Sequence, residues 1–176
     1  MIINERDNRI ERAIAVAQQM ITAARTAPKA KGWDLIETCI VTGDDINKLS
    51  EAMLNMEYRG GNYNFERDSA NILSAQCIVL IGSKANNLAL NCGHCGYIKC
   101  GDKPTDTPCA FNAIDVGIAV GSACATAADL RVDTRVLFSA GLAAQKLNYL
   151  PDSELIMAIP VSIASKNPFF DRVPKK

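Results

Sequence analysis

The stretch AFNAIDVGIAVGSACATAA, residues 110–128, is the longest weakly polar segment of the chain. It predicts a long helix from about Asn112 to Leu130, and its many small side chains make that helix unusually slim. Gly117 and Gly121 stand in the helix interior, where a glycine costs about 1 kcal/mol relative to alanine. We therefore expect another backbone to approach this helix closely, either a sister helix or the same helix of a second copy.

Packing of this helix against a second copy of the chain gives the expected assembly. A small-sided helix face lets two backbones come close together, and burial against a second copy offsets the cost of the glycines. The sequence thus predicts a two-fold homodimer that buries on the order of 2,000 Å² or more, with this helix at or near the interface. The alternative is a monomer in which the same helix is simply the central core helix.

Four further helices are predicted around this segment. Apolar residues recur at helical spacing over 8–25. A second helix follows the turn at 42–45, which supplies its N-cap. Shorter helices are expected over 66–73 and 134–147.

Strands are predicted at 35–41, 77–81 and 155–163. The first has apolar residues on both faces, which is usual for a strand covered on both sides. The second is apolar throughout and ends at a glycine, as expected for a central strand. Pro160 interrupts the third run, which suits an edge strand or a strand end.

Length and composition describe a chain the size of one domain. The 176 residues carry nineteen acidic and nineteen basic side chains, and neither sign forms a long block, which argues against a nucleic-acid partner. The N-terminus is charged where a signal peptide would be apolar, and no apolar run reaches the roughly 18 residues of a membrane span. We expect a cytoplasmic protein whose seven cysteines remain thiols or metal ligands.

Four of these cysteines fall within residues 92–109: Cys92, Cys95, Cys100 and Cys109. The run CGHCG at 92–96 resembles a rubredoxin-type knuckle, in which two thiolates grip one ion and glycines allow the tight turn. The other two thiols complete a four-thiolate set, which suits tetrahedral zinc, a single iron or a [4Fe–4S] cluster. The spacing alone does not choose between zinc and a cluster.

Two other interpretations of the cysteines are open. They could be unrelated free thiols, or the first two could form a redox disulfide. His94, the only histidine, lies in the gap of the knuckle, and we expect its ring to point to solvent. The remaining cysteines lie in strand or helix patterns and are interpreted as buried structural thiols: Cys39, Cys77 and Cys124.

Three segments resemble elements of the flavin-dependent nitroreductases. AARTAPKAKGW (23–33) before a strand is similar to their helix, Ala-Pro-Ser loop and strand. DVGIA (115–119) is similar to the start of their central dimer helix, and IPVSI (159–163) to their last strand. Over nearly its full length, the chain resembles a group of small bacterial and archaeal proteins described as containing a ferredoxin domain.

This resemblance implies an α+β fold of the nitroreductase kind, with a mixed, partly antiparallel sheet flanked by helices. We expect one such domain over residues 1–176, with the cysteine-rich loop 91–109 inserted in it. The resemblance favours an iron–sulfur cluster over zinc and electron transfer as the function, coupled to a flavin at a dimer interface.

FMN binding by the isolated chain is nevertheless expected to be weak or absent. Nitroreductases hold the FMN phosphate with an arginine- and serine-rich element before their opening helix, and this sequence starts after that point. Lys29 stands where their loop has serine. The remaining cations for a phosphate are Arg25, Lys29 and Lys31, which could equally form a solvated turn, and Arg172, which matches a phosphate-binding arginine of that family only loosely.

The leading hypothesis is a redox protein that passes electrons through a cluster held by the four loop cysteines, with an oxidoreductase activity left open. The alternative is a non-enzymatic protein with a structural zinc site on a nitroreductase-like scaffold that has lost its flavin. No residue stands out as a catalytic acid, base or nucleophile. The sequence does not identify the electron donor, the acceptor or the redox partner.

Overall fold

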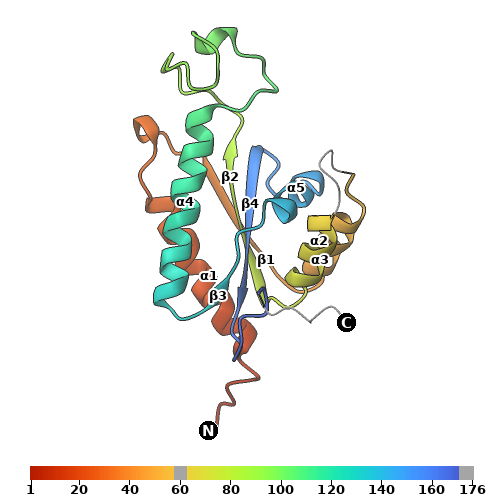
Figure 1. Cartoon of the computed structure of the whole chain (residues 1–176). Coiled ribbons are helices and arrows are strands. Elements are labelled where there is room, and N and C mark those ends of the chain that lie inside the picture. The colour runs from red at the N-terminus through yellow and green to blue at the C-terminus, as the bar shows by residue number, and fades with distance from the viewer. Residues whose placement is uncertain (58–62, 171–176) are drawn as a thin grey trace.

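A four-stranded sheet separates two layers of helices (Figure 1). The computed structural model describes residues 1–57 and 63–170. Its helices are α1 (Arg9–Thr26), α2 (Asp44–Leu54), α3 (Tyr63–Ile72), α4 (Ala110–Asp129) and α5 (Phe138–Lys146). Its strands are β1 (Ile36–Val41), β2 (Cys77–Lys84), β3 (Asp133–Thr134) and β4 (Ser153–Ser162), and single 3₁₀ turns lie at Ala30–Gly32 and Cys100–Asp102. The α+β class is confirmed.

The strands lie in the order β1-β2-β4-β3, and every neighbouring pair is antiparallel. The sheet of the described chain is therefore antiparallel throughout, where a mixed sheet was expected. The path of the chain gives the reason. After β2 the chain runs back along the sheet in α4 and returns through β3 and α5 (Figure 1). Because it re-enters beside the end of β2, where Lys84 pairs with Ser153, β4 runs opposite to β2.

β4 is an inner strand, although Pro160 suggested an edge strand or a strand end. Pro160 has the same orientation as Ala158, whose N–H donates to the carbonyl of Leu137 at 3.1 Å on the β3 side. The ladder on that side is interrupted between Leu137 and Thr134. The position that lacks an N–H therefore faces the interruption and not β2, so no ladder bond is lost.

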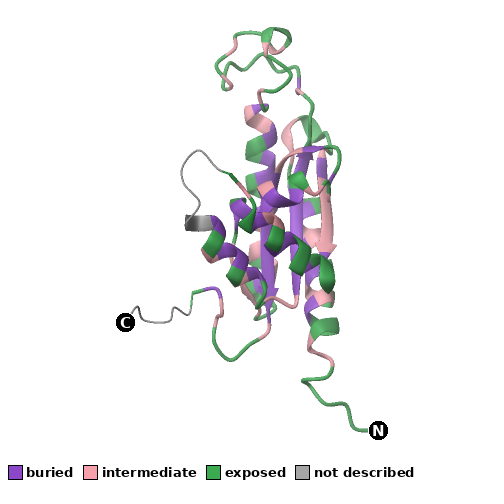
Figure 2. Cartoon of the chain, turned by 90° about the vertical axis from the view of Figure 1, so that its right-hand side faces the viewer, coloured by how far each residue is buried: buried purple, intermediate pink, exposed green. Residues whose placement is uncertain are grey.

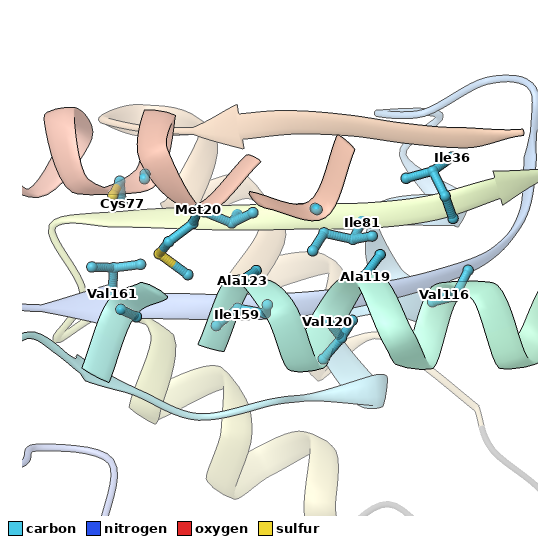
Figure 3. Packing of buried hydrophobic residues seen from close by; sticks show 14 of the residues in the cluster. Met20, Ile36, Cys77, Ile81, Val116, Ala119, Val120, Ala123, Ile159 and Val161 are labelled. Atoms are coloured by element: carbon cyan, nitrogen blue, oxygen red, sulfur yellow. The ribbon is translucent and has the colours of Figure 1, made fainter. Parts of the chain in front are cut away.

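The residues of β2 alternate between two cores, one on each face of the sheet. Cys77, Val79 and Ile81 pack with α1 and α4 (Figure 3), whereas Ile78 and Leu80 pack with α2, α3 and α5. All five are completely buried. Burial on both faces is what the continuous apolar run predicted for a central strand.

α1 and α4 lie side by side on one face of the sheet (Figures 1 and 3). They meet through small buried residues, and the hydroxyl of Ser122 donates to the carbonyl of Ala23 at 3.0 Å. α1 is thus a sister helix for one face of α4. Gly117 and Gly121 lie on another face, which is exposed, and a Cβ atom added at either would meet nothing within 4 Å. The small residues that face the core are Ala13, Ala17 and Ala24 of α1 and Ala119, Ala123 and Ala127 of α4.

α4 is the one helix of the described chain that could cross a membrane by length and composition, a test that core helices of soluble proteins also pass. Its buried face contributes Val116 and Val120 to the core shared with α1 and the sheet (Figure 3). We therefore interpret α4 as a core helix.

Candidate metal centre

The cysteine-rich loop projects from one end of the sheet, between the end of β2 and the start of α4 (Figures 1 and 2). Most of its residues are exposed. The buried Asn112, in the first turn of α4, fixes the base of the loop. Its side-chain N–H groups donate to the carbonyls of Lys84 (3.3 Å) and Asn86 (2.6 Å), and Glu154 Oε1 lies 3.5 Å away. One side chain therefore holds both ends of the loop together.

We expect Asn112→Asp to lower the free energy of unfolding by about 3 kcal/mol at neutral pH, because it places a buried carboxylate with no N–H against three oxygen atoms. The same surroundings would raise the pKa of the new carboxyl. The loss should therefore shrink as pH falls and grow as pH rises. Urea unfolding at several pH values measures it.

Asn87→Asp is the matched control for this change. The side-chain oxygen of Asn87 accepts the N–H of Ala89 at 3.0 Å, and an aspartate keeps that bond. We expect a change within about 0.5 kcal/mol. Equal effects of the two substitutions would show that Asn112 does not hold the base of the loop.

Cys95 lies in a tight turn over residues 93–96, closed by the N–H of Gly96 donating to the carbonyl of Gly93 at 2.9 Å, and Cys92 directly precedes this turn. The two glycines have φ values of +76° and +90°, a region that residues with a Cβ atom avoid. The knuckle thus has the glycine requirement that the sequence indicated. His94 is exposed, as expected, and its ring centroid lies 5.7 Å from that of Phe111.

Asn91 holds Cys100 through two hydrogen bonds. The N–H of Asn91 donates to Cys100 Sγ at 3.3 Å, and its side-chain oxygen accepts the N–H of Cys100 at 2.8 Å. A hydrogen bond from a backbone N–H favours negative charge on the sulfur. This arrangement suits a thiolate ligand.

Cys109 is the N-cap residue of α4 and is 7% exposed. The N-terminus of a helix carries partial positive charge, which favours an anionic group within the first turn. The third and fourth candidate ligands are therefore both fixed by the fold, one through Asn91 and the other by the start of α4.

The four cysteines line one pocket, although their side chains are not arranged as a finished metal site. The pocket wall includes Cys92, Cys95, Cys100 and Cys109 together with Leu88, Leu90, Tyr97, Lys103 and Phe111. Within residues 1–57 and 63–170, no three His, Cys, Asp or Glu side chains are grouped so as to hold an ion. All four thiols are free, so no disulfide blocks them. The four cysteines nevertheless surround one pocket, and a χ1 rotation moves a sulfur without moving the backbone. The four-cysteine site stays a prediction.

Of the three cysteines outside the loop, Cys77 is buried as expected, whereas Cys39 and Cys124 are only partly buried. Burial raises the pKa of Cys39 to about 11 and that of Cys77 to about 12. Burial also raises the pKa of Cys124, opposed by a hydrogen bond with Thr134. Thiols that ionise this reluctantly are poor metal ligands at neutral pH, in keeping with a structural role.

Arg25 and Lys29, two of the candidate phosphate ligands, form hydrogen bonds with groups at or after the C-terminal end of α1. Arg25 Nη1 donates to both carboxylate oxygens of Asp34 at 2.8 Å. The Lys29 side chain is 6% exposed, and its ammonium donates to the carbonyls of Arg25, Ala24 (3.4 Å) and Ala27 (2.8 Å). Lysine at this position satisfies carbonyl groups that the helix end leaves open.

Lys31 is also engaged within the chain. Its ammonium donates to the carbonyl of Leu88 at 3.1 Å and lies 4.4 Å from the ring centroid of Trp33. It thereby connects the loop after α1 to the segment that enters the cysteine-rich loop. Arg172, the fourth candidate, lies outside the described residues.

Asp115 is a positioning residue that the sequence analysis did not single out. Its buried carboxylate accepts the N–H of Ala30 at 3.1 and 3.2 Å. Burial raises the pKa of this carboxyl, opposed by the Ala30 hydrogen bond and the charge of Lys29. Asn112 and Asp115 are polar residues one turn apart on an otherwise apolar helix. This pattern was the sequence signal that could have indicated their roles. Their partners lie far away in the sequence and come together only in the fold.

Comparison with known proteins identifies the family. Residues 105–172 match the family described as "uncharacterized protein containing a ferredoxin domain". A protein from Archaeoglobus fulgidus, described as an uncharacterized protein, is 39% identical over 186 residues and covers the whole of both chains. The chain belongs to this family. Of the four loop cysteines, the matched segment contains Cys109, so the match does not itself test the complete set.

Solved structures with the same fold are nitroreductases and related oxidoreductases. A nitroreductase with bound FMN from Desulfitobacterium hafniense is 15% identical, with a TM-score of 0.59 over 99% of this chain and 96% of that one. An NAD(P)H:FMN oxidoreductase, so described provisionally, from Staphylococcus epidermidis is 14% identical, with a TM-score of 0.60 over 93% of this chain and 82% of that one. At these identities the likeness shows the fold, and the nitroreductase-like architecture is confirmed.

Proposed function

We propose that this chain is a redox protein in which Cys92, Cys95, Cys100 and Cys109 hold an iron–sulfur cluster that carries electrons. The observation behind the proposal is that all four thiols line a single pocket at the N-terminus of α4. Membership of a family described as containing a ferredoxin domain supports a redox role. The seven free thiols suit the reducing cytoplasm that we propose as its location.

Each part of the loop has a defined role in this proposal. The glycines at 93 and 96 shape the knuckle, Asn91 donates to Cys100 Sγ, and the start of α4 favours charge on Cys109. Leu88, Leu90 and Phe111 contribute apolar side chains to the pocket wall. When bound, an iron–sulfur cluster supplies a one-electron couple whose potential depends on hydrogen bonds and exposure of this kind.

Reduction tests the proposed role directly. Anaerobic protein reconstituted with iron and sulfide should lose visible absorbance on addition of dithionite and recover it on reoxidation. A reconstituted protein whose spectrum does not respond to either treatment would not be an electron carrier. If the spectrum does respond, the donor and the acceptor are to be sought among proteins that restore or discharge the reduced form.

FMN is expected to be absent from the isolated chain at stoichiometric levels, because the described candidate cations are engaged with other groups of this chain. Lys29→Met should lower the free energy of unfolding by about 1–3 kcal/mol, since it leaves buried carbonyls without a donor. It should leave FMN affinity unchanged. Thermal unfolding and flavin fluorescence titration measure the two effects. A protein that is isolated with one FMN per chain and loses it in Lys29→Met would contradict this prediction.

We also propose a homodimer that packs through the exposed face of α4. Gly117 and Gly121 are open on this face, and Ile114 and Ile118 beside them are 46% and 39% exposed. The contact with α1 explains the alanines of α4 but not these residues. A second copy would cover the apolar side chains and use the space that the glycines leave.

Gly121→Leu should therefore dissociate the dimer, because the leucine side chain occupies space that the second backbone needs. Light scattering at micromolar concentration measures the change. Gln18→Leu, which adds the same side chain to the exposed face of α1, should leave the dimer intact. Wild-type protein that is monomeric at this concentration would rule out the interface.

A further inference from the structure

Lys103 lies in the wall of the cysteine pocket and is the only residue of that wall, apart from the four thiols, whose side chain can carry charge at neutral pH. It is half-buried, three residues after Cys100. Its ammonium donates to the carbonyls of Pro104 (3.2 Å) and Thr107. Two backbone groups therefore hold the charge in place, and an ammonium still has a third N–H to offer.

The charge of Lys103 is not neutralised by a carboxylate. No ion pair within residues 1–57 and 63–170 includes it. Lys103 also lines a neighbouring polar pocket with Asn86, Thr105 and Glu154, yet it makes no contact with Glu154 within ion-pair distance among the described residues. Within the described residues, Lys103 therefore brings a cation without a carboxylate partner to the wall that the four thiols share.

The four thiolates create an electrostatic problem that Lys103 can relieve. Four thiolates around a divalent ion, or around a cluster core of the same charge, leave two net negative charges. The pocket wall is largely apolar, and apart from Lys103 it offers no cationic side chain to offset this charge. The start of α4 supplies partial positive charge, and Lys103 supplies a full one.

We propose that Lys103 is the charge-compensating residue of the four-cysteine centre, strengthening metal binding and raising the reduction potential of a bound cluster. It is a positioning residue and not a ligand, because the metal is held by sulfur. The inference rests on the proposed four-cysteine site. It adds the identity of the side chain that offsets the negative charge of that site.

The test is an anaerobic titration of the metal-free protein with Co²⁺, whose bond to thiolate gives a charge-transfer absorption. Lys103→Met keeps the stem of the side chain and removes the charge. We expect it to weaken Co²⁺ binding about tenfold or more, the range measured for groups next to metal ligands. Lys103→Arg retains the charge and should stay close to wild type.

Lys99→Met is the matched control. Lys99 is exposed, adjoins Cys100 and lies outside the pocket wall, so the substitution removes the same charge from the same loop. We expect a change in Co²⁺ affinity of less than about twofold, because water and salt screen exposed charges. Circular dichroism confirms that each variant is folded.

The outcomes distinguish the role of Lys103 from the existence of the four-cysteine site. Equal affinities of Lys103→Met and Lys99→Met, with thiolate-bound Co²⁺ in both, would overturn the role of Lys103 and leave the four-cysteine site standing. Wild-type protein that gives no thiolate–Co²⁺ absorption would overturn the site and the role of Lys103 together. An affinity of Lys103→Arg as low as that of Lys103→Met would show that the shape of lysine matters and not its charge.

Discussion

Cys109→Ala is expected to reduce the metal content of anaerobically purified protein about tenfold or more, because a four-thiolate site that loses one ligand is left with an open, unstable coordination. Cys109 is the most informative of the four, since it comes from the start of α4 and not from the turns of the loop. Metal analysis and the visible spectrum measure the loss.

Cys124→Ala is the matched control for this substitution. Cys124 lies in the same helix, faces the core and is distant in sequence from the loop. It should leave the metal content unchanged. A protein that retains full metal in Cys109→Ala would show that the centre uses a different ligand set, and the proposed role of the helix start would be wrong.

Gly141→Ala is expected to lower the free energy of unfolding by about 3 kcal/mol or more, because there is no space for the added methyl group. A Cβ atom at Gly141 would lie 1.9 Å from the carbonyl oxygen of Ile156 and 3.2 Å from Met157 Cα, both in the backbone of β4. α5 would have to move away from the sheet, and it packs against an inner strand. Chemical denaturation measures the change.

Lys146→Ala in the same helix provides the comparison. Lys146 is exposed, and its replacement should change the free energy of unfolding by less than about 0.5 kcal/mol. A loss below about 1 kcal/mol in Gly141→Ala would mean that α5 does not lie directly on the backbone of β4.

Local patterns predicted most of the helices and strands. The apolar recurrence over 8–25 corresponds to α1 at Arg9–Thr26, and the apolar run at 77–81 lies in the inner strand β2. These elements bury long, regular apolar faces, which leave a clear periodic signal. The segment 134–147 is different, because its first residue pairs with β4 and the helix begins only at Phe138. That boundary is set by a strand far along the chain.

The direction of the strands could not be read from periodicity. An antiparallel and a parallel neighbour can bury the same alternating side chains, so only the path of the chain through α4 and α5 decides between them. The prediction that Pro160 marks an edge strand or a strand end was wrong, because it too depends on the neighbouring strand. Its missing N–H is tolerated in an inner strand because the neighbouring ladder happens to be interrupted there.

Some features of the candidate site could likewise be predicted from the sequence, and others could not. The four cysteines could be grouped in advance because they lie within residues 92–109, where a short loop brings its own residues together. The roles of Asn112 and Asp115 could not, since they contact Asn86 and Ala30 across long stretches of chain. Lys103 lies inside the loop, yet its place in the wall of the cysteine pocket depends on how the loop folds back.

The central claim is that the four loop cysteines hold an iron–sulfur cluster. The most direct measurement is the iron, sulfide, zinc and FMN content of protein purified without oxygen, together with its absorption spectrum. The account predicts iron and acid-labile sulfide, a broad visible absorption, and neither zinc nor FMN in stoichiometric amount. A colourless protein with one zinc per chain would contradict it and favour a structural zinc site on a scaffold that has lost its flavin.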